Sequence, residues 1–384
     1  MEPLADAARW LDERAAEMER ELAELVAENS FTDNVEGGRK VGARLASHTF
    51  AIRGLDRRVV SSQRFADHLV LSSRGDASKR PIALIGHLDT VFPPGTFEGF
   101  RRDGDLARGP GVLDMKGGLV VVAWALRAIA ETAGLDAIAP VRLAIVADEE
   151  VGSPEGQPII REAIAGARGA LVFEAGRKGD LVITRRKGTG SVTAVATGRA
   201  AHAGNNHKEG KNAIWALARF VDRAQALTDY ARGVTVNVGV VSGGTSKNTV
   251  PERAEAQLDL RFESVADGEK LVSDLRAAAE KHGVEGVSIT VSGGVARHPL
   301  ERTDASVALM NAYLESAKES GLGGGEAALI GGGSDASTSS AIGIASIDGL
   351  GPRGIGFHTK DEQIEIATLV LKAKALARFL LRWT

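Results

Sequence analysis

PIALIGHLD (residues 81–89) is the first of three apolar runs that decide the fold of this chain; VRLAIVADEE (141–150) and GALVFEAG (169–176) are the others. Each run predicts a buried strand, because it is short, apolar and followed by turn or polar residues. Helical patterns separate the three runs, at KGGLVVVAWALRAIAETAG (116–134) and QPIIREAIAG (157–166). The β–α–β–α–β order predicts an α/β domain with a mostly parallel sheet and helices on both faces.

A different pattern occupies residues 188–297. Its elements follow the order strand, helix, strand, strand, helix, strand, which is typical of a ferredoxin-like α+β unit. Because α/β patterning resumes afterwards, we expect this unit to be a domain inserted into the first. The α/β domain would then be discontinuous, comprising residues 1–187 and 298–384.

Five more elements are expected in the α/β domain. The first 28 residues predict one charged, amphipathic helix. After the inserted domain, a helix is expected at 306–319, apolar runs predict strands at 327–333 and 344–351, and a long helical pattern covers 361–383. At 384 residues, two domains are also the expectation from chain length.

Composition excludes several classes of function. The net charge is −3, so no electrostatic footprint for nucleic acid or for an anionic membrane surface is present. No stretch has the roughly 20 apolar residues of a membrane span, and the start lacks the apolar core of a signal peptide. We therefore expect a cytoplasmic protein, with a secreted form trimmed of its signal as the alternative. The chain has no cysteine, so any metal must be bound by imidazole and carboxylate.

Acidic residues and histidines lie at the C-terminal ends of the predicted strands, where open α/β sheets bind their ligands. His87 and Asp89 are two residues apart at one strand end, so both side chains point the same way. Asp89 could fix the ring of a metal-bound His87, or the two could form a hydrogen-bonded surface pair. Asp114 precedes a predicted helix, so it could either cap that helix or bridge two metals.

Two further strand ends and the last motif supply more candidate ligands. Glu149 and Glu150 close the strand at 141–150, and neighbouring strand residues point to opposite sides. One can therefore bind metal while the other moves protons; solvated turn residues are the alternative. Glu174 closes the next strand and His358 precedes the last helix. Together these residue types predict a two-metal site and metal-assisted hydrolysis.

A family resemblance covers almost the whole chain. It is carried by GHLDTVFPPGTF, GPGVLDMKGG, ADEEVGS, GRAAHAG and GGGSDAS. These segments resemble the signature of the dizinc metallopeptidase and deacylase family of glutamate carboxypeptidase, succinyl-diaminopimelate desuccinylase, acetylornithine deacetylase and aminoacylase. The glutamate carboxypeptidase branch is the most similar. The resemblance implies a zinc-exopeptidase-like fold whose inserted domain serves as a lid and for dimerisation.

The resemblance also implies a division of the metal ligands. Asp114 would bridge two Zn²⁺ ions, His87 and Glu174 would complete one site, and Glu150 and His358 the other. Co²⁺ or Mn²⁺ would be plausible substitutes at such ligands. The resemblance further implies a cis peptide bond between Asp114 and Met115.

Three catalytic roles follow from the same resemblance. Glu149 would be the general base and acid, taking a proton from water and passing it to the leaving amine. Asp89 would orient the metal ligand at position 87. His202 would stabilise the oxyanion, from the partner subunit in several family members. On the residues alone, the preferred interpretation of His202 is a loop histidine near a domain surface.

Substrate contacts are expected in the inserted domain and in one loop. By resemblance, Asn248 and Arg261 would bind the substrate carboxylate, for which a guanidinium fork is well suited. The alternative for Arg261 is a solvent-facing strand residue. The backbone N–H groups of Gly332, Gly333 and Ser334 could bind the same anion.

The function expected from these residues is zinc-dependent hydrolysis of an amide bond next to a free carboxylate. A glutamate carboxypeptidase-like enzyme is the first choice, acting on a small peptide. An N-acyl-amino-acid deacylase of the acetylornithine deacetylase or desuccinylase type is the alternative. A non-catalytic metal-binding protein is a third possibility, against which the presence of Glu149 argues. We expect a homodimer formed through the inserted domain, with hinges near 187–189 and 295–298.

Overall fold

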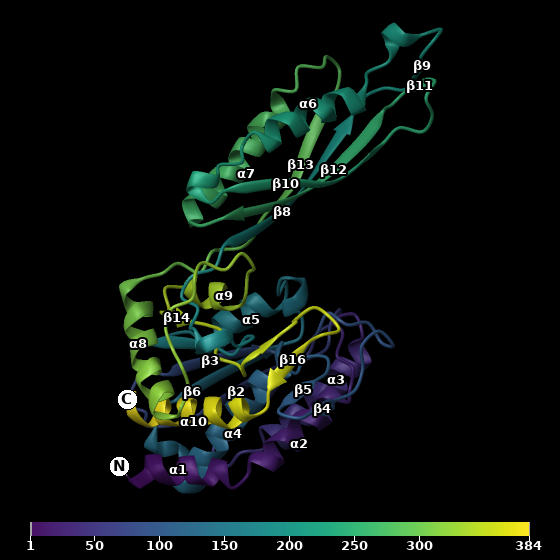
Figure 1. Ribbon diagram of the computed structural model, residues 1–384. Coiled ribbons are helices and arrows are strands. Elements are labelled where there is room, and N and C mark those ends of the chain that lie inside the picture. The colour runs from purple at the N-terminus through teal and green to yellow at the C-terminus, as the bar shows by residue number, and fades with distance from the viewer. Residues whose placement is uncertain (1, 384) are drawn as a thin grey trace. The chain divides into compact units, whose positions relative to one another are not determined.

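The computed structural model describes residues 2–383 and divides the chain into two compact units (Figure 1). The first unit contains the residues up to 184, residues 302–329 and those from 334 onward. The second unit contains residues 185–301 and 330–333. The expected limits of the inserted domain, 188 and 297, lie a few residues inside the second unit.

A six-stranded sheet forms the centre of the first unit, with the strand order β1-β2-β6-β3-β7-β14. The last four of these strands are mutually parallel, which confirms the mostly parallel sheet predicted from the sequence. β2 pairs antiparallel with β6, and β1 pairs antiparallel with β2. Every residue of β3 is buried, as expected for a central strand covered on both faces. The strands are β1 (Leu55–Val60), β2 (His68–Ser73), β3 (Ile82–His87), β6 (Val141–Val146), β7 (Gly169–Val172) and β14 (Ser346–Ile347).

Helices cover both faces of this sheet; α1, α4 and α10 lie on one face, and α5 and α9 on the other (Figure 1). Helix α4 is buried on almost all sides because it packs against α1, α2 and α10 as well as β3. Its sequence is correspondingly apolar all round. The helices are α1 (Glu2–Asp12), α2 (Ala15–Val26), α3 (Val35–Arg44), α4 (Lys116–Thr132), α5 (Gly156–Ala163), α8 (Asp304–Glu319), α9 (Ala336–Ser340) and α10 (Ala367–Arg382).

Three expected elements are wrong in detail. The single N-terminal helix is two helices, broken near Arg14, which has non-helical backbone angles and lets both helices pack on α4. The strand expected at 327–333 does not form, and only isolated bridges occur at Glu326 and Ile330. Its three glycines offer no side chains to bury in a sheet. The strand expected at 344–351 is shortened to β14.

A second, smaller sheet replaces the start of the expected C-terminal helix. Its strand order is β15-β16-β5-β4, and all its pairings are antiparallel. β15 and β16 form a hairpin whose connecting loop, residues 356–362, carries His358. The strands are β4 (Arg101–Asp103), β5 (Leu106–Arg108), β15 (Gly354–Ile355) and β16 (Gln363–Glu365).

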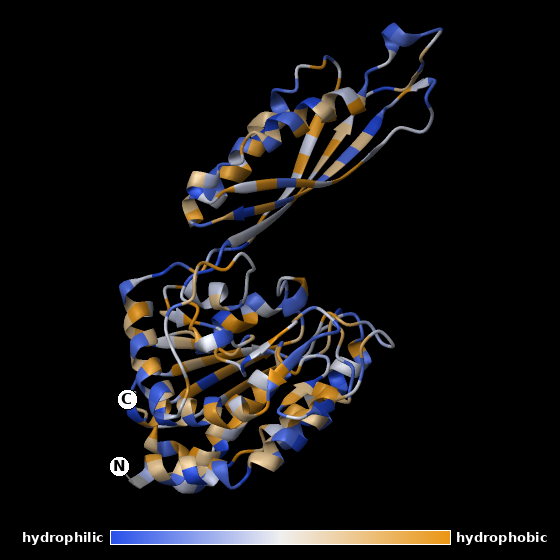
Figure 2. Cartoon of the chain, in the orientation of Figure 1, coloured by the Kyte–Doolittle hydropathy of each residue, from blue (hydrophilic) through white to orange (hydrophobic). Residues whose placement is uncertain are grey.

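The second unit is the ferredoxin-like domain predicted from the sequence. Its four-stranded antiparallel sheet has the order β10-β12-β8-β13, and α6 and α7 pack on it. Figure 2 shows hydrophobic and hydrophilic bands alternating along both helices, which bury only one face. A two-stranded ribbon of β9 and β11 extends from this sheet. The elements are β8 (Gly188–Thr197), β9 (Ala201–His202), α6 (Ala213–Gln225), β10 (Thr235–Gly243), β11 (Thr249–Val250), β12 (Arg253–Phe262), α7 (Val265–Glu280) and β13 (Ser288–Arg297).

Residues 2–383 include no helix that is both long enough and apolar enough to cross a membrane.

Candidate metal centre

The carboxyl ends of three neighbouring parallel strands meet at one edge of the central sheet. His87 is the last residue of β3, and Glu174 follows the end of β7. Glu149 and Glu150 lie in a 3₁₀ turn directly after β6. Because β6, β3 and β7 are adjacent and parallel, these four side chains come together at the edge where α/β sheets bind ligands.

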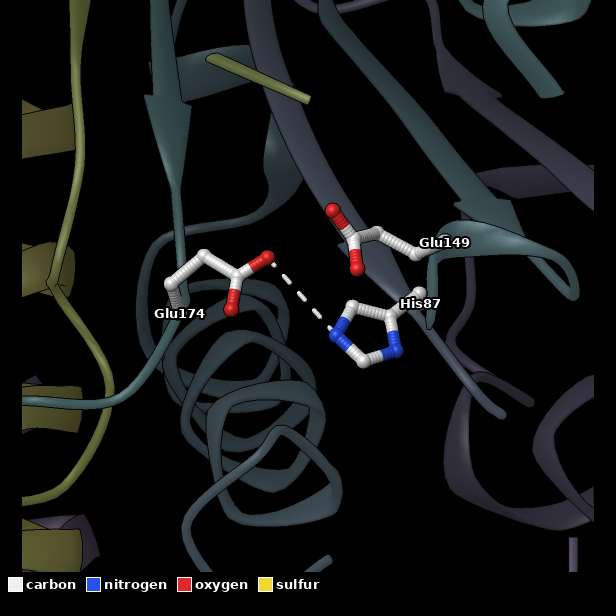
Figure 3. Close-up of side chains that lie close together, drawn as sticks. All are labelled: His87, Glu149 and Glu174. Carbon is white, nitrogen blue, oxygen red and sulfur yellow. Dashed lines mark ion pairs between the residues drawn. The ribbon is translucent and has the colours of Figure 1, made fainter. Parts of the chain in front are cut away.

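Asp114 lies between the two histidines of this cluster, with one carboxylate oxygen toward each. Its Oδ1 is 3.3 Å from His87 Nε2, and its Oδ2 is 3.3 Å from His358 Nε2. Glu174 Oε1 is 3.6 Å from the same nitrogen of His87 (Figure 3), and Glu150 Oε2 is 3.1 Å from His358 Nε2. The geometry therefore has two halves, each with a histidine and a glutamate, that share one aspartate.

Glu149 lies in the same cluster. Figure 3 shows its carboxylate next to the ring of His87, with Glu174 approaching the same ring from another side. The ligand atoms of His87, Glu149 and Glu174 lie within 4.8 Å of one another, and so do those of His87, Asp114 and Glu150. Distance alone thus permits Glu149 to be either a metal ligand or a general base.

Burial makes the charges of this cluster costly without a cation. Burial raises the pKa of Glu174 to about 8, and the nearby charge of Asp114 adds to the effect. Burial likewise raises the pKa of Glu150 to about 7. Hydrogen bonds to Asp114 and Glu150 raise the pKa of His358 to about 10. Crowded carboxylates and neutral imidazoles are the donors that divalent cations such as Zn²⁺ take in proteins, so the cluster fits a metal centre.

Asp89 connects His87 to the turn that carries the two glutamates. Its Oδ1 is 3.3 Å from His87 Nδ1, the ring nitrogen that faces away from Asp114. The two oxygens of Asp89 also accept the backbone N–H groups of Glu149 and Glu150, each at 3.2 Å. Such a carboxylate fixes the tautomer and the orientation of a metal-bound histidine.

Thr32 is a residue of the site that sequence reasoning missed. Its hydroxyl donates to Asp89 Oδ2 at 2.8 Å, and both side chains are buried. Nothing in its surrounding sequence, NSFTDN, distinguishes this threonine from a turn residue.

The segment around Asp114 explains how this carboxylate reaches the centre. The N-cap of α4 is Met115 and not Asp114, so the capping interpretation of Asp114 is wrong. The Asp114–Met115 peptide bond is cis, as the family resemblance implied. At Gly118, a Cβ would lie 2.1 Å from the carbonyl oxygen of Phe173. Only glycine therefore lets the first turn of α4 approach the end of β7 so closely.

His202 and Asn248 come together on the ribbon of the second unit. His202 pairs with Thr249, and the N–H of Ala203 donates to the carbonyl oxygen of Asn248 at 2.9 Å. His202 Nδ1 accepts the backbone N–H groups of Gly204 and Asn205, each at 3.1 Å. In the neutral ring the proton must then lie on Nε2, which makes that atom a hydrogen-bond donor.

Arg261 lies far from this ribbon within the second unit. It is near the C-terminal end of β12, whereas the ribbon adjoins the start of that strand at Arg253. At ~3.4 Å per strand residue, the two places are roughly 27 Å apart. Its guanidinium donates two hydrogen bonds to Asp259, at 2.8 and 2.9 Å. One chain therefore does not bring Arg261 and Asn248 onto the same small carboxylate.

In the loop of residues 331–334, there is open space at Gly332, whereas the side chain of Ser334 is already hydrogen-bonded. A Cβ at Gly332 would meet nothing within 4 Å, whereas one at Gly333 would lie 3.1 Å from Arg297. The Gly332 carbonyl accepts a hydrogen bond from Arg186 at 3.1 Å. The buried hydroxyl of Ser334 donates to Asp348 at 2.6 Å, so the side chain of Ser334 points into the protein.

Comparisons with known proteins show which proteins this chain is similar to in sequence and in fold. A sequence profile described as a peptidase dimerisation domain matches residues 184–287. Carboxypeptidase G2 of Pseudomonas sp. is 28% identical over 82% of this chain and 76% of its own length. Succinyl-diaminopimelate desuccinylase of Dinoroseobacter shibae is 30% identical over 70% of this chain and 74% of its own length. The crystal structure of an M20 family metallo-carboxypeptidase from Sulfolobus solfataricus matches with a TM-score of 0.74 and 19% identity, over 95% of this chain and 98% of that one.

Proposed function

Because this chain belongs to the M20 family of metallopeptidases and related amidohydrolases, we propose that it hydrolyses an amide bond next to a free carboxylate, as a carboxypeptidase. The observation that carries this proposal is the placement of Asp114 between His87 and His358, with one oxygen toward each. The similarity to carboxypeptidase G2 over most of the chain supports a carboxypeptidase. C-terminal glutamate as the residue released is proposed from the resemblance of the sequence motifs to the glutamate carboxypeptidase branch.

The metal ligands are proposed as two sets that share Asp114. His87 and Glu174 would hold one ion, and Glu150 and His358 the other. Nitrogen and oxygen donors without any cysteine favour Zn²⁺, with Co²⁺ or Mn²⁺ able to replace it. Two such cations would polarise the scissile carbonyl and acidify the attacking water.

The remaining side chains of the centre would handle protons and geometry. Glu149, fixed through its backbone by Asp89, would accept the proton of the attacking water and deliver it to the leaving amine. Asp89 would hold the ring of His87 with Nε2 toward the metal. His202 would donate from Nε2 to the oxygen that becomes negative in the transition state.

Substrate recognition is proposed to come from two groups. Arg261 of one chain and Asn248 from the ribbon of a second chain would bind the substrate carboxylate, together with backbone N–H groups of Gly332, Gly333 and Ser334. Arg261 would have to exchange one or both of its hydrogen bonds to Asp259 for the substrate.

A deacylase is the second candidate function, favoured by the similarity to a desuccinylase. Both candidates hydrolyse an amide and release an acid and an amine, and they differ in which side of the amide bond the enzyme recognises. A metal-binding protein without activity is the remaining alternative. A cytoplasmic location stays a prediction from the sequence.

A substrate panel tests the proposed function. The zinc-loaded protein should release glutamate from folate-like and dipeptide substrates, and should act more slowly on N-acetyl and N-succinyl amino acids. Amidation of the substrate's carboxylate should abolish turnover, since the anion contact is lost. A preference for N-acyl amino acids would establish the deacylase instead. If zinc-, cobalt- and manganese-loaded protein hydrolyse none of these compounds, the proposed function is wrong.

We also propose that two chains associate through the second unit. β10 is an edge strand, and exposed apolar residues of α6 and β10 flank a groove of about 430 Å³ between them. Exposed edges and apolar patches of this kind mark protein interfaces. A dimer would also allow Arg261 to act together with Asn248 and His202, because the ribbon of the partner chain could supply Asn248 and His202. The exposed apolar residues of α6 and β10 include Ile214, Trp215, Val240 and Val241.

The dimer is tested by placing a charge in this groove. Val241→Glu should convert a dimeric mass in light scattering to a monomeric one and lower activity, because a buried, unpaired carboxylate opposes association. Tyr230→Glu is the matched control, since Tyr230 is 85% exposed and lies outside α6 and β10. A fully active, monomeric wild-type protein would rule out both the dimer and a role for His202 in a neighbouring subunit.

A further inference from the structure

Glu362 is a completely buried carboxylate next to the metal centre to which no role has been assigned above. It lies at the end of the loop that carries His358 and has an exposed fraction of 0%. A carboxylate in such a place must have its oxygens satisfied by hydrogen bonds, since burial of an unpaired charge is very unfavourable.

The oxygens of Glu362 accept hydrogen bonds from the Asp114 loop, residues 109–115. Oε1 accepts the backbone N–H groups of Leu113 at 2.9 Å and of Asp114 itself at 3.0 Å. Oε2 accepts the N–H of Gly111 at 3.2 Å. The carbonyl oxygen of Glu362 accepts a fourth N–H, that of Gly109, at 3.4 Å.

The Asp114 loop depends on these bonds for its shape. Gly109 and Gly111 have positive φ angles, and residues 109–115 belong to neither a helix nor a strand. No helix or sheet ladder therefore satisfies the N–H groups of Leu113 and Asp114. The Glu362 side chain takes the place of such a ladder, and without it those buried N–H groups would lose their partners.

The other end of the connection is the His358 loop. The N–H of Glu362 donates to the carbonyl oxygen of Thr359 at 3.1 Å, and the N–H of Thr359 donates to that of Gly356 at 3.0 Å. These turns hold His358 at φ 62°, a left-handed conformation that is uncommon for residues other than glycine. One side chain thus joins the loop of Asp114 to the loop of His358.

We propose that Glu362 is a positioning residue that sets the distance between Asp114 Oδ2 and His358, and so defines the second of the two metal sites. This inference rests on the proposed dinuclear centre. His87 and Glu174 follow directly from β3 and β7, so the first site is held by the central sheet. Loss of the Glu362 carboxylate should therefore weaken the second site selectively.

Glu362→Gln tests the proposal with a side chain of the same shape. One of its two terminal atoms becomes an NH₂ group, which cannot accept a backbone N–H. Titration of the metal-free, full-length protein with Zn²⁺ in the presence of a competing chelator should show one site within about threefold of wild type. The other site should weaken by roughly 10–100-fold, the usual effect of losing an outer-shell partner of a metal ligand.

The matched control is Asp361→Asn. Asp361 is the preceding residue of the same loop, with a side chain that is 83% exposed and paired to Arg108. This variant should bind both ions as the wild-type protein does. Equal loss at both sites in Glu362→Gln, or wild-type affinity at both, would overturn the proposal.

Amide hydrogen exchange provides a readout that needs no metal. In the metal-free protein, Glu362→Gln should speed exchange at Gly111, Leu113 and Asp114, whereas Asp361→Asn should leave it unchanged. Unchanged exchange in Glu362→Gln would contradict the proposal even if metal binding fell. If the wild-type protein binds no divalent cation, the proposed function fails, and the exchange rates still decide whether Glu362 holds the loop. Glu362→Ala, which removes both acceptor oxygens, should weaken the second zinc site and speed amide exchange more than Glu362→Gln does.

Discussion

Glu149→Gln is expected to retain two zinc ions and to lose roughly 10²–10⁴-fold in kcat, the range typical of removing a general acid–base. Glutamine keeps the shape of the side chain but cannot accept the proton of the attacking water. The backbone N–H of Glu149 still donates to Asp89 in this variant, so the turn that also carries Glu150 stays in place. Steady-state kinetics and metal analysis of the same sample provide the two measurements.

This variant also decides between two roles that distance permits. Because Glu149 lies within ligand range of His87 and Glu174, it could bind metal itself. A loss of one zinc equivalent in Glu149→Gln would show that it is a ligand and that the base is another group. Glu162→Gln is the control, since the Glu162 side chain is 75% exposed and pairs with Arg58 on the surface. It should leave both kcat and metal content unchanged.

Asp114→Asn is expected to have the larger effect on metal binding. Each oxygen of Asp114 faces a different histidine, so one substitution alters both sites at once. We expect zinc affinity to fall at both sites by more than the ~10–100-fold that an outer-shell partner contributes, and hydrolysis to fall to background. Equilibrium dialysis against buffered zinc measures both sites.

The stability of the metal-free Asp114→Asn protein separates this effect from misfolding. Without metal, burial opposes the charge of Asp114, but hydrogen bonds from His358 and His87 still hold the pKa of its carboxyl well below the usual range, so this charge stabilises the metal-free protein. Its removal should therefore lower the melting temperature of the metal-free protein while leaving a single cooperative transition. Asp103→Asn, at an exposed position of β4, is the matched control. Retention of one tightly bound ion in Asp114→Asn would show that Asp114 does not bridge.

The main features of the centre could be predicted because each ligand ends a recognisable pattern. Three apolar strands predicted a parallel sheet, and parallel strands necessarily bring His87, Glu150 and Glu174 to the same edge. His358 could be singled out only as a histidine that precedes the last expected helix, because β16, which completes the hairpin that presents it, was expected to be the start of that helix. That expectation failed because Ile364 is buried in a pairing with β5, which periodicity cannot reveal.

The positions of supporting residues could not be predicted from the sequence. Thr32 contacts Asp89, and Glu362 contacts the Asp114 loop, across 57 and 248 residues of chain. Such hydrogen bonds depend on how loops fold back, and no local pattern encodes them. The same limit applies to Arg261: the sequence suggested a substrate contact, whereas the structure shows its bonds to Asp259 and its distance from the ribbon.

Anomalous X-ray scattering from a zinc-loaded crystal tests the central claim most directly. We expect two zinc peaks on either side of the Asp114 carboxylate, about 3.5–4 Å apart as in other two-metal sites. One should contact His87 and Glu174, and the other Glu150 and His358. A single peak, or a second peak bound by Glu149 in place of Glu150, would contradict the shared-aspartate centre.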